Sequence, residues 1–376
     1  MVAASLPERR RRRSSKRFRL VLAASLVGGP AAGVACGPLE PSVAASRDAE
    51  ADPAEAGAAP VVEAAADAPA GPRLRERLSQ TGLYTDTAQK VLAVDALAFR
   101  PAFPLWSDGA AKERWVRLPP NTTIDTTDPD HWILPVGAQL FKEFSLDGKR
   151  LETRLVERVA ATGKLEADYW LGAFLWRDDE SDADFVEAGA SNVRATSHDV
   201  PSAEACWSCH IGEPGHALGF TALQLSHELG GLNLATLRAK GLVPSALVDR
   251  GVPGDPTARG AVGYLHANCG HCHNENGASW PDTDMVLRVA YGESSVTSAR
   301  LFTSTVGVAT KSFRSSGFSV RIEPGDPDAS AVAHRLGTRT DGGAMPPIAT
   351  KLVDPDGVQR VREWIAELPP RDAGAD

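Results

Sequence analysis

Two short cysteine motifs constrain this chain more than any other feature of its sequence. The chain has 5 cysteines in 376 residues, and four of them form two Cys-x-x-Cys pairs, each followed at once by a histidine. We call them the first motif (Cys206, Cys209, His210) and the second motif (Cys269, Cys272, His273). This pattern attaches haem c covalently: the thiols reach two vinyl groups on one porphyrin edge, and the histidine ligates the iron.

Other uses of the four cysteines stay open at this point. Two Cys-x-x-Cys pairs can hold a structural zinc ion, act as redox dithiols or form disulfides. None of these needs a histidine directly after both pairs. With 9 His in 376 residues, chance places one after both pairs in about one case in 1,700. We therefore predict two covalently bound haem c groups, with His210 and His273 as proximal iron ligands.

The second motif has further parts of a haem module around it. Residues Ala261–Asn268 are predicted to form a short helix that leads into Cys269. Far downstream, Met345 precedes two prolines that stiffen its loop. A methionine thioether is a soft iron ligand and raises the reduction potential relative to a second histidine. Because the initial methionine is expected to be lost and Met285 lies in a predicted extended run, Met345 is the expected distal ligand.

A helix is predicted to close this module. Asp354 is a candidate N-cap, Pro355 suits the first helical position, and apolar residues recur at helical spacing from Val358 to Leu368. We expect this helix to pack across the one that delivers Cys269.

The first motif is less complete. Short helices are predicted to begin near Pro201 and to cover Phe220–Glu228 and Asn233–Lys240. No methionine lies between the two motifs. The distal ligand could be a histidine, a methionine from elsewhere, or nothing; the candidate histidines are His198, His216, His227 and His131. His271 is expected to face solvent, and His266 to orient a haem propionate or to pack.

The N-terminal residues resemble an export signal. Eight Lys and Arg among the first nineteen residues precede an apolar run, Leu20–Ala35, which is too short and too interrupted by glycine and proline to span a bilayer. The run ends at Cys36 in a loose lipobox, so we expect a lipoprotein, with simple cleaved export as the alternative. A twin-arginine signal fits poorly, because haem is attached after the unfolded chain has crossed the membrane. Residues 37–72 are Ala, Pro and acidic residues, which predicts a disordered tether.

The net charge of the chain restricts the classes of partner that it can bind. The first nineteen residues carry eight of the 40 Lys and Arg and one of the 48 Asp and Glu, so the remainder has a formal charge of about −15. Such a surface repels nucleic acid and steers basic partners. We therefore expect redox proteins as partners, no nucleic acid, and membrane contact only through a lipid on Cys36, in the periplasm or at the cell surface.

The segment before the motifs reads as β structure. Leu140–Leu146 and Leu151–Val159 are strand-like and are separated by Asp147-Gly148, a tight-hairpin signal. Tyr169–Trp176 is a further strand candidate, and a helix is expected near Leu74–Leu97. The tryptophans of this segment are interpreted as core residues; they are Trp106, Trp115, Trp132, Trp170 and Trp176.

These patterns predict an α+β fold: a β-sandwich-like N-terminal domain followed by mainly α cytochrome c-type haem lobes. The expected segments are a signal peptide at 1–36, a linker at 37–72, the β domain with its leading helix at 73–193, the first haem lobe at 194–250 and the second at 251–370.

Several segments together resemble a family of uncharacterised exported dihaem c-type cytochromes. They include Phe103–Ala110, Lys112–Trp115, Glu152–Leu155, Tyr264–Cys269, Pro324–Pro327 and Met345–Pro347, so the resemblance runs from about Pro101 to Leu368. It implies a β domain followed by cytochrome c lobes, and electron transfer as the role. The family's substrate is not established, so the resemblance does not identify a pathway.

The sequence thus predicts an electron carrier that needs no general acid or base. One rival is a dihaem peroxidase, which needs one haem with an open sixth position; the motifs, 63 positions apart, are close for two full lobes of that kind. Another is the cytochrome subunit of a dehydrogenase. Both rivals keep the same haem assignment.

Overall fold

The computed structural model describes residues 75–280, 282–311, 313, 317–340 and 343–370, which all belong to the compact unit that begins at Asp67. The predicted signal, Cys36 and the tether lie outside the described residues. Among the residues described, no helix has the length and apolar character needed to cross a bilayer.

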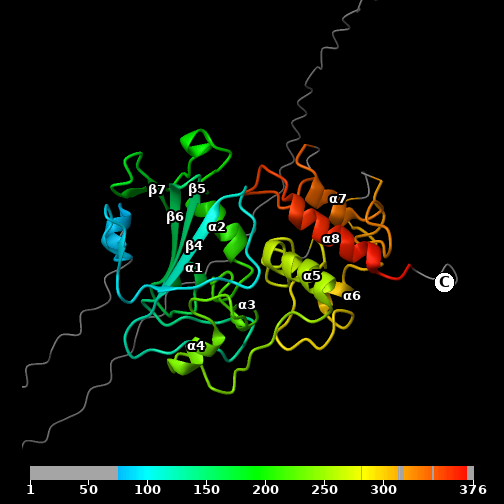
Figure 1. Ribbon diagram of the computed structural model, residues 1–376, viewed down its shortest axis with the longest axis horizontal. Coiled ribbons are helices and arrows are strands. Elements are labelled where there is room, and N and C mark those ends of the chain that lie inside the picture. The colour runs from blue at the N-terminus through cyan, green and yellow to red at the C-terminus, as the bar shows by residue number, and fades with distance from the viewer. Residues whose placement is uncertain (1–74, 281, 312, 314–316, 341–342, 371–376) are drawn as a thin grey trace, which may run out of the picture. The chain divides into compact units, whose positions relative to one another are not determined.

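A six-stranded antiparallel sheet, in the sequential order β3-β4-β5-β6-β7-β8, forms the first half of the described chain (Figure 1). A separate two-stranded sheet, β1-β2, precedes it. The strands are β1 (Tyr84–Asp86), β2 (Val91–Leu92), β3 (Leu97–Ala98), β4 (Ala111–Arg117), β5 (Gln139–Leu146), β6 (Lys149–Arg158), β7 (Tyr169–Trp176) and β8 (Ala183–Phe185).

The helices are short and are joined by long irregular segments. They are η1 (Leu78–Thr81), α1 (Leu165–Asp168), η2 (Val193–Ala195), α2 (Ala203–His210), α3 (Ala222–Leu225), α4 (Leu234–Ala239), α5 (Pro256–Asn268), α6 (Arg300–Thr303), α7 (Ala331–Gly337) and α8 (Pro355–Glu367).

The predicted fold class is therefore wrong. The β segment is one large sheet with a small one beside it, not a sandwich, and the segments that carry the two motifs are not mainly α. Between α5 and α8 the described chain forms only the short helices α6 and α7. The many Gly, Pro, Ser, Thr, Asn and Asp residues of this stretch favour turns over helix, which accounts for the difference.

The expected leading helix near Leu74–Leu97 is also wrong. The chain makes one helical turn, η1, and then the β1-β2 hairpin and the start of β3. Gly82 directly follows η1 with a left-handed φ of 80°, a conformation that commonly ends a helix.

Several local predictions are confirmed. The β5–β6 hairpin turns at Asp147-Gly148, both with positive φ, as a type I′ turn requires. The Asp354 side chain accepts a hydrogen bond from the amide of Gly357 and caps α8, with Pro355 at its first position. Of the five tryptophans expected in the core, Trp115, Trp132 and Trp176 are buried, whereas Trp106 and Trp170 are half-buried.

The two faces of the large sheet differ. One face carries Trp115, Phe141 and Phe174 into an apolar cluster that also holds η1 and β1 residues. On the other face, Val116 and Leu140 join a cluster that continues through residues 217–243, which follow the first motif. The first-motif segment and the sheet therefore share one hydrophobic core.

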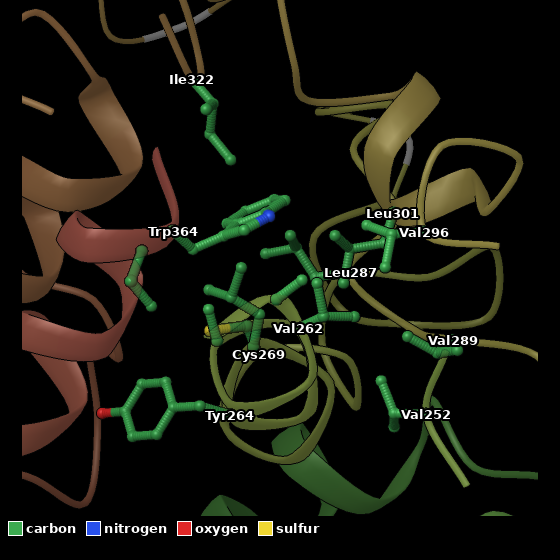
Figure 2. Close-up of a cluster of buried hydrophobic side chains, with 14 of the residues drawn as sticks. Val252, Val262, Tyr264, Cys269, Leu287, Val289, Val296, Leu301, Ile322 and Trp364 are labelled. Atoms are coloured by element: carbon green, nitrogen blue, oxygen red, sulfur yellow. The ribbon is translucent and has the colours of Figure 1, made fainter. Parts of the chain in front are cut away.

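The second motif has its own core. Helices α5 and α8 pack against each other, as the sequence predicted (Figure 1). Figure 2 shows Trp364 of α8 and Cys269 in the same apolar cluster as Val262 of α5. The thiol of Cys269 thus lies at the edge of a packed core.

The contact between α5 and α8 predicts the effect of one substitution. A Cβ at Gly357 would lie 2.3 Å from the ring of Tyr264, so Gly357→Ala is expected to destabilise the fold by about 1–3 kcal/mol through overpacking. Gly260→Ala, also helical but with no atom near its Cβ, is expected to be neutral or to stabilise by up to about 1 kcal/mol. Urea unfolding of both variants measures the difference, and equal effects would contradict the packing described.

Candidate haem-attachment site

Helix α2 presents the first motif against the sheet. Ser202 caps the helix by accepting a hydrogen bond from the amide of Ala205, and the helix ends at His210. Cys206 is buried against Tyr169 and Leu171 of β7. The sheet therefore fixes where the first pair of thiols lies.

The ring of His210 is oriented by a hydrogen bond. Its Nδ1–H donates to the carbonyl of His216 at 2.8 Å, and Nδ1–H of His216 donates to the carbonyl of His210 at 2.7 Å. Since a carbonyl only accepts, Nδ1 of His210 carries the proton and Nε2 has the lone pair. Burial lowers the pKa of His210 to about 4, so the imidazole is neutral at pH 7. A histidine that ligates a metal has this arrangement.

The second motif follows α5, whose first turn Asp255 caps. Ser279 Oγ donates to the carbonyl of Cys272 at 2.7 Å and lies 3.2 Å from Nδ1 of His273. Because its proton is already used, this hydroxyl accepts from Nδ1–H, which again leaves Nε2 with the lone pair. Burial, followed by the charge of Arg335, lowers the pKa of His273 to about 4.

Beside the second motif is a cavity of about 350 Å³. Cys269, His273 and Met345, which lie far apart in the sequence, all line it. Apolar residues such as Leu287 and Leu336 form much of the rest of its wall. The volume is within the range of cofactor pockets, about 300–1,000 Å³, and a largely apolar wall with a few polar groups suits a porphyrin. The residues present therefore fit a haem attached at the second motif.

Met285 also lines this cavity. Met345 is the distal ligand predicted from the sequence, but both methionines line the wall of this cavity. The two thioethers are thus rival ligands that can be compared directly.

The two motifs meet. The ligand atoms of Cys209, His271 and Cys272 all lie within 4.8 Å of one another. A Cβ at Gly212 would lie only 2.0 Å from the carbonyl oxygen of His271, so the backbones are in direct contact there. A second cavity of about 360 Å³ is lined by residues of both motifs. Groups attached at the two motifs would therefore lie close together.

His271 is buried, 9% exposed, so the expectation that it faces solvent is wrong. The loop after the first motif covers it, as the contact with Gly212 shows. His266 accepts the amide N–H of Val289 at Nδ1, 3.1 Å away, so its neutral ring carries its proton on Nε2. Burial lowers the pKa of His266 to about 3.

The histidines considered as distal ligands of the first motif are engaged elsewhere. His198 Nε2 lies 2.7 Å from Glu152. His227 donates from Nε2 to the carbonyl of Arg100 and accepts the amide of Leu229 at Nδ1. His131 Nδ1 lies 2.7 Å from Glu213.

His216 and His210 exchange hydrogen bonds between ring Nδ1 and backbone carbonyl. His216 therefore lies on the Nδ1 side of the His210 ring, away from the Nε2 atom of His210. His216 is therefore placed to support the proximal histidine and not to face it across an iron. The Nε2 atom of His216 is buried without a hydrogen-bond partner in the described structure, and the His216 ring makes edge-to-face contacts with Tyr169 and Trp207.

A buried charge network lies next to the first motif and, apart from His198, was not among the predicted site residues: Arg154 and His198 line one cavity with Cys209. The carboxylate of Glu152, 0% exposed, accepts hydrogen bonds from Arg154 at 2.5 and 2.9 Å and contacts His198. Arg114 and Lys142 lie on the same face of the sheet. One sequence signal could have indicated this network. Charged and apolar residues alternate along β4 to β6, so that the charged side chains share one face of the sheet, and the rest of the chain covers that face.

Disulfide formation and structural zinc binding are the other chemistries open to these cysteines. The four described cysteines form no disulfide. A structural zinc site takes four ligands, whereas the described chain gathers three such groups, Cys209, His271 and Cys272, at one place. Cys206 and Cys269 are not part of that group.

Comparisons with models of known protein families, with curated proteins and with solved structures found no match.

Proposed function

We propose that this chain is a dihaem c-type cytochrome that transfers electrons between redox proteins outside the cytoplasm. One observation carries the proposal: both Cys-x-x-Cys pairs are followed by a histidine whose Nδ1–H is engaged, so that Nε2 offers its lone pair. In this proposal the four cysteines anchor the porphyrins, His210 and His273 hold the irons, and Met345 is the second ligand of one iron.

Bound haem would supply one-electron chemistry. The residues around it would set the orientation and the protonation of its histidine ligands. The hydrogen bonds from His210 to His216 and from His273 to Ser279 fix the tautomer and angle of each proximal ring. The contact between the motifs at Gly212 favours direct exchange between the two haems. A lipid on Cys36 would hold the mature chain at a membrane, and the tether would let it reach its partners.

A dihaem peroxidase is the second candidate, favoured by a specific observation. His198, His227 and His131 are each bonded to another group, and His216 lies behind His210. These contacts favour a first-motif iron with an open sixth position, where peroxide could bind.

The proposal is tested by producing the full chain in a host competent in cytochrome maturation and measuring its intact mass. We expect its intact mass to include two haems, and the variant Cys206→Ser/Cys209→Ser to lose one and keep the other. Zinc in place of haem, or no added mass, would refute the proposal. The absorption spectrum of the oxidised protein then separates the candidates: two low-spin haems inert to peroxide identify a carrier, and a high-spin haem with peroxide turnover identifies the peroxidase.

A further inference from the structure

Three cations stand opposite one another on the sheet face next to the first motif. In the register of β4, β5 and β6, Arg114 pairs with Lys142, and Lys142 pairs with Arg154. Like charges directly opposite on neighbouring strands repel. Such a row of cations is compatible with a stable fold only where a negatively charged group lies nearby and offsets the repulsion.

One of the three has its counter-ion in the chain, because Arg154 is paired with Glu152. In the part of the chain that the structure describes, no carboxylate forms an ion pair with Arg114 or Lys142. Arg114 is only 7% exposed. Burial, followed by the charge of Arg100, lowers its pKa to about 10, and burial followed by Arg114 and Arg154 lowers the pKa of Lys142 well below its ordinary value. Arg114 is buried and Lys142 is half-buried. The ammonium of Lys142 lies over the ring of Phe144, 5.3 Å from its centroid, but neither cation has a negative counter-ion among the described residues.

Arg114 and Lys142 line a cavity of about 50 Å³. His266, whose Nε2 carries its proton, lines it as well. A single water needs about 10–15 Å³ by this kind of measure, so the cavity can hold a carboxylate group.

The acids on the wall of the cavity are already engaged. Glu213 binds Arg288 at 2.5 Å and His131 at 2.7 Å. Asp130 accepts the amide of Tyr291. The cavity thus offers donors and positive charge that the neighbouring acids do not use.

We propose that this cavity binds a carboxylate, held by Arg114 and Lys142. The carboxylate belongs either to a propionate of the first-motif haem or to a small free acid. The first source rests on the proposed function; the second does not. In either case the sheet is part of the functional site, and its cation row holds the anionic end of a bound molecule.

The test compares Lys142→Met with Lys142→Arg, which keeps the charge, and with Lys149→Met, the same charge change at an exposed position of the β5–β6 hairpin. Arg114→Met gives a second, independent removal of charge. Replacing a cation that has no ion-pair partner in the described chain by an apolar side chain is expected to permit folding, and the melting temperature of each full-length variant checks this.

Two measurements distinguish the two sources. If a propionate occupies the cavity, Lys142→Met lowers the reduction potential of one haem, because the propionate charge is no longer offset. Lys142→Arg and Lys149→Met leave the potential unchanged, and the shift is absent from the variant Cys206→Ser/Cys209→Ser, which lacks the first haem. If a free acid occupies it, acetate or succinate raises the melting temperature of the unmodified chain and of Lys149→Met, but not of Lys142→Met.

If Lys142→Met and Arg114→Met behave as Lys149→Met in both measurements, the carboxylate site is refuted. A chain that carries no haem refutes the proposed function alone, since the titration with acetate still tests the cavity.

Discussion

Replacing Met345 by leucine is expected to lower the reduction potential of the haem proposed at the second motif and to remove its methionine-to-iron charge-transfer band. Met345 lines the cavity beside Cys269 and His273, and a thioether ligand raises the potential of haem iron. Leucine has a similar volume, so the packing cost should be under about 1.5 kcal/mol. Redox titration and near-infrared absorption of the purified protein measure both effects.

Met285→Leu is the matched control, because Met285 lines the same cavity. It should leave the potential and the band unchanged. The opposite result, with the potential falling in Met285→Leu and not in Met345→Leu, would show that the wrong methionine has been assigned. No change in either variant would exclude methionine ligation at this motif.

Glu152→Gln is expected to destabilise the fold by about 3–5 kcal/mol, the cost of leaving a buried charge without its partner. Glu152 is 0% exposed, and Arg154, whose side chain is 21% exposed, depends on it. Asp184→Asn is the control: its ion pair with Arg177 is 37% and 50% exposed, and such surface pairs contribute about 0–1 kcal/mol. Denaturant unfolding at pH 7 measures both. A loss for Glu152→Gln no larger than that for Asp184→Asn would contradict the network.

The same carboxylate makes stability depend on pH. Burial raises the pKa of Glu152, but Arg154 and His198 outweigh it, so the pKa lies below its ordinary value of 4.5. A carboxyl with a lowered folded pKa contributes stability above its unfolded pKa and loses it as the pH falls through the folded value. The unmodified protein should therefore lose this contribution as the pH falls below about 4.5, whereas Glu152→Gln lacks this part of the acid dependence.

Local signals in the sequence predicted local structure well. Asp147-Gly148 indicated a hairpin because few other residues adopt two positive φ values, and Asp354-Pro355 indicated a helix start because cap and ring geometry act within one turn. The way the strands combine could not be predicted from such signals. Alternating strands suit a sandwich or a single sheet equally, and only the contacts of each face decide between them.

The candidate site was predictable in part, for the same reason. Spacing alone identifies the motif residues. The structure adds that Met345 lines a cavity together with Cys269 and His273, while its role as an iron ligand stays a prediction. The burial of His271 was not predictable, since it depends on contact with Gly212 from another part of the chain. Nor did the sequence indicate that Arg114 and Lys142 stand opposite one another, because strand register is a tertiary property.

The apolar cluster that joins the sheet to residues 217–243 bears on how such a protein can change over evolution. Side chains such as Phe99 and Phe220, whose rings meet edge to face at 4.8 Å, come from both sides of the first motif. Neither segment can be removed or replaced without exposing the apolar surface of the other to water. The sheet and the segment that carries the first motif should therefore be inherited together, as a single evolutionary unit.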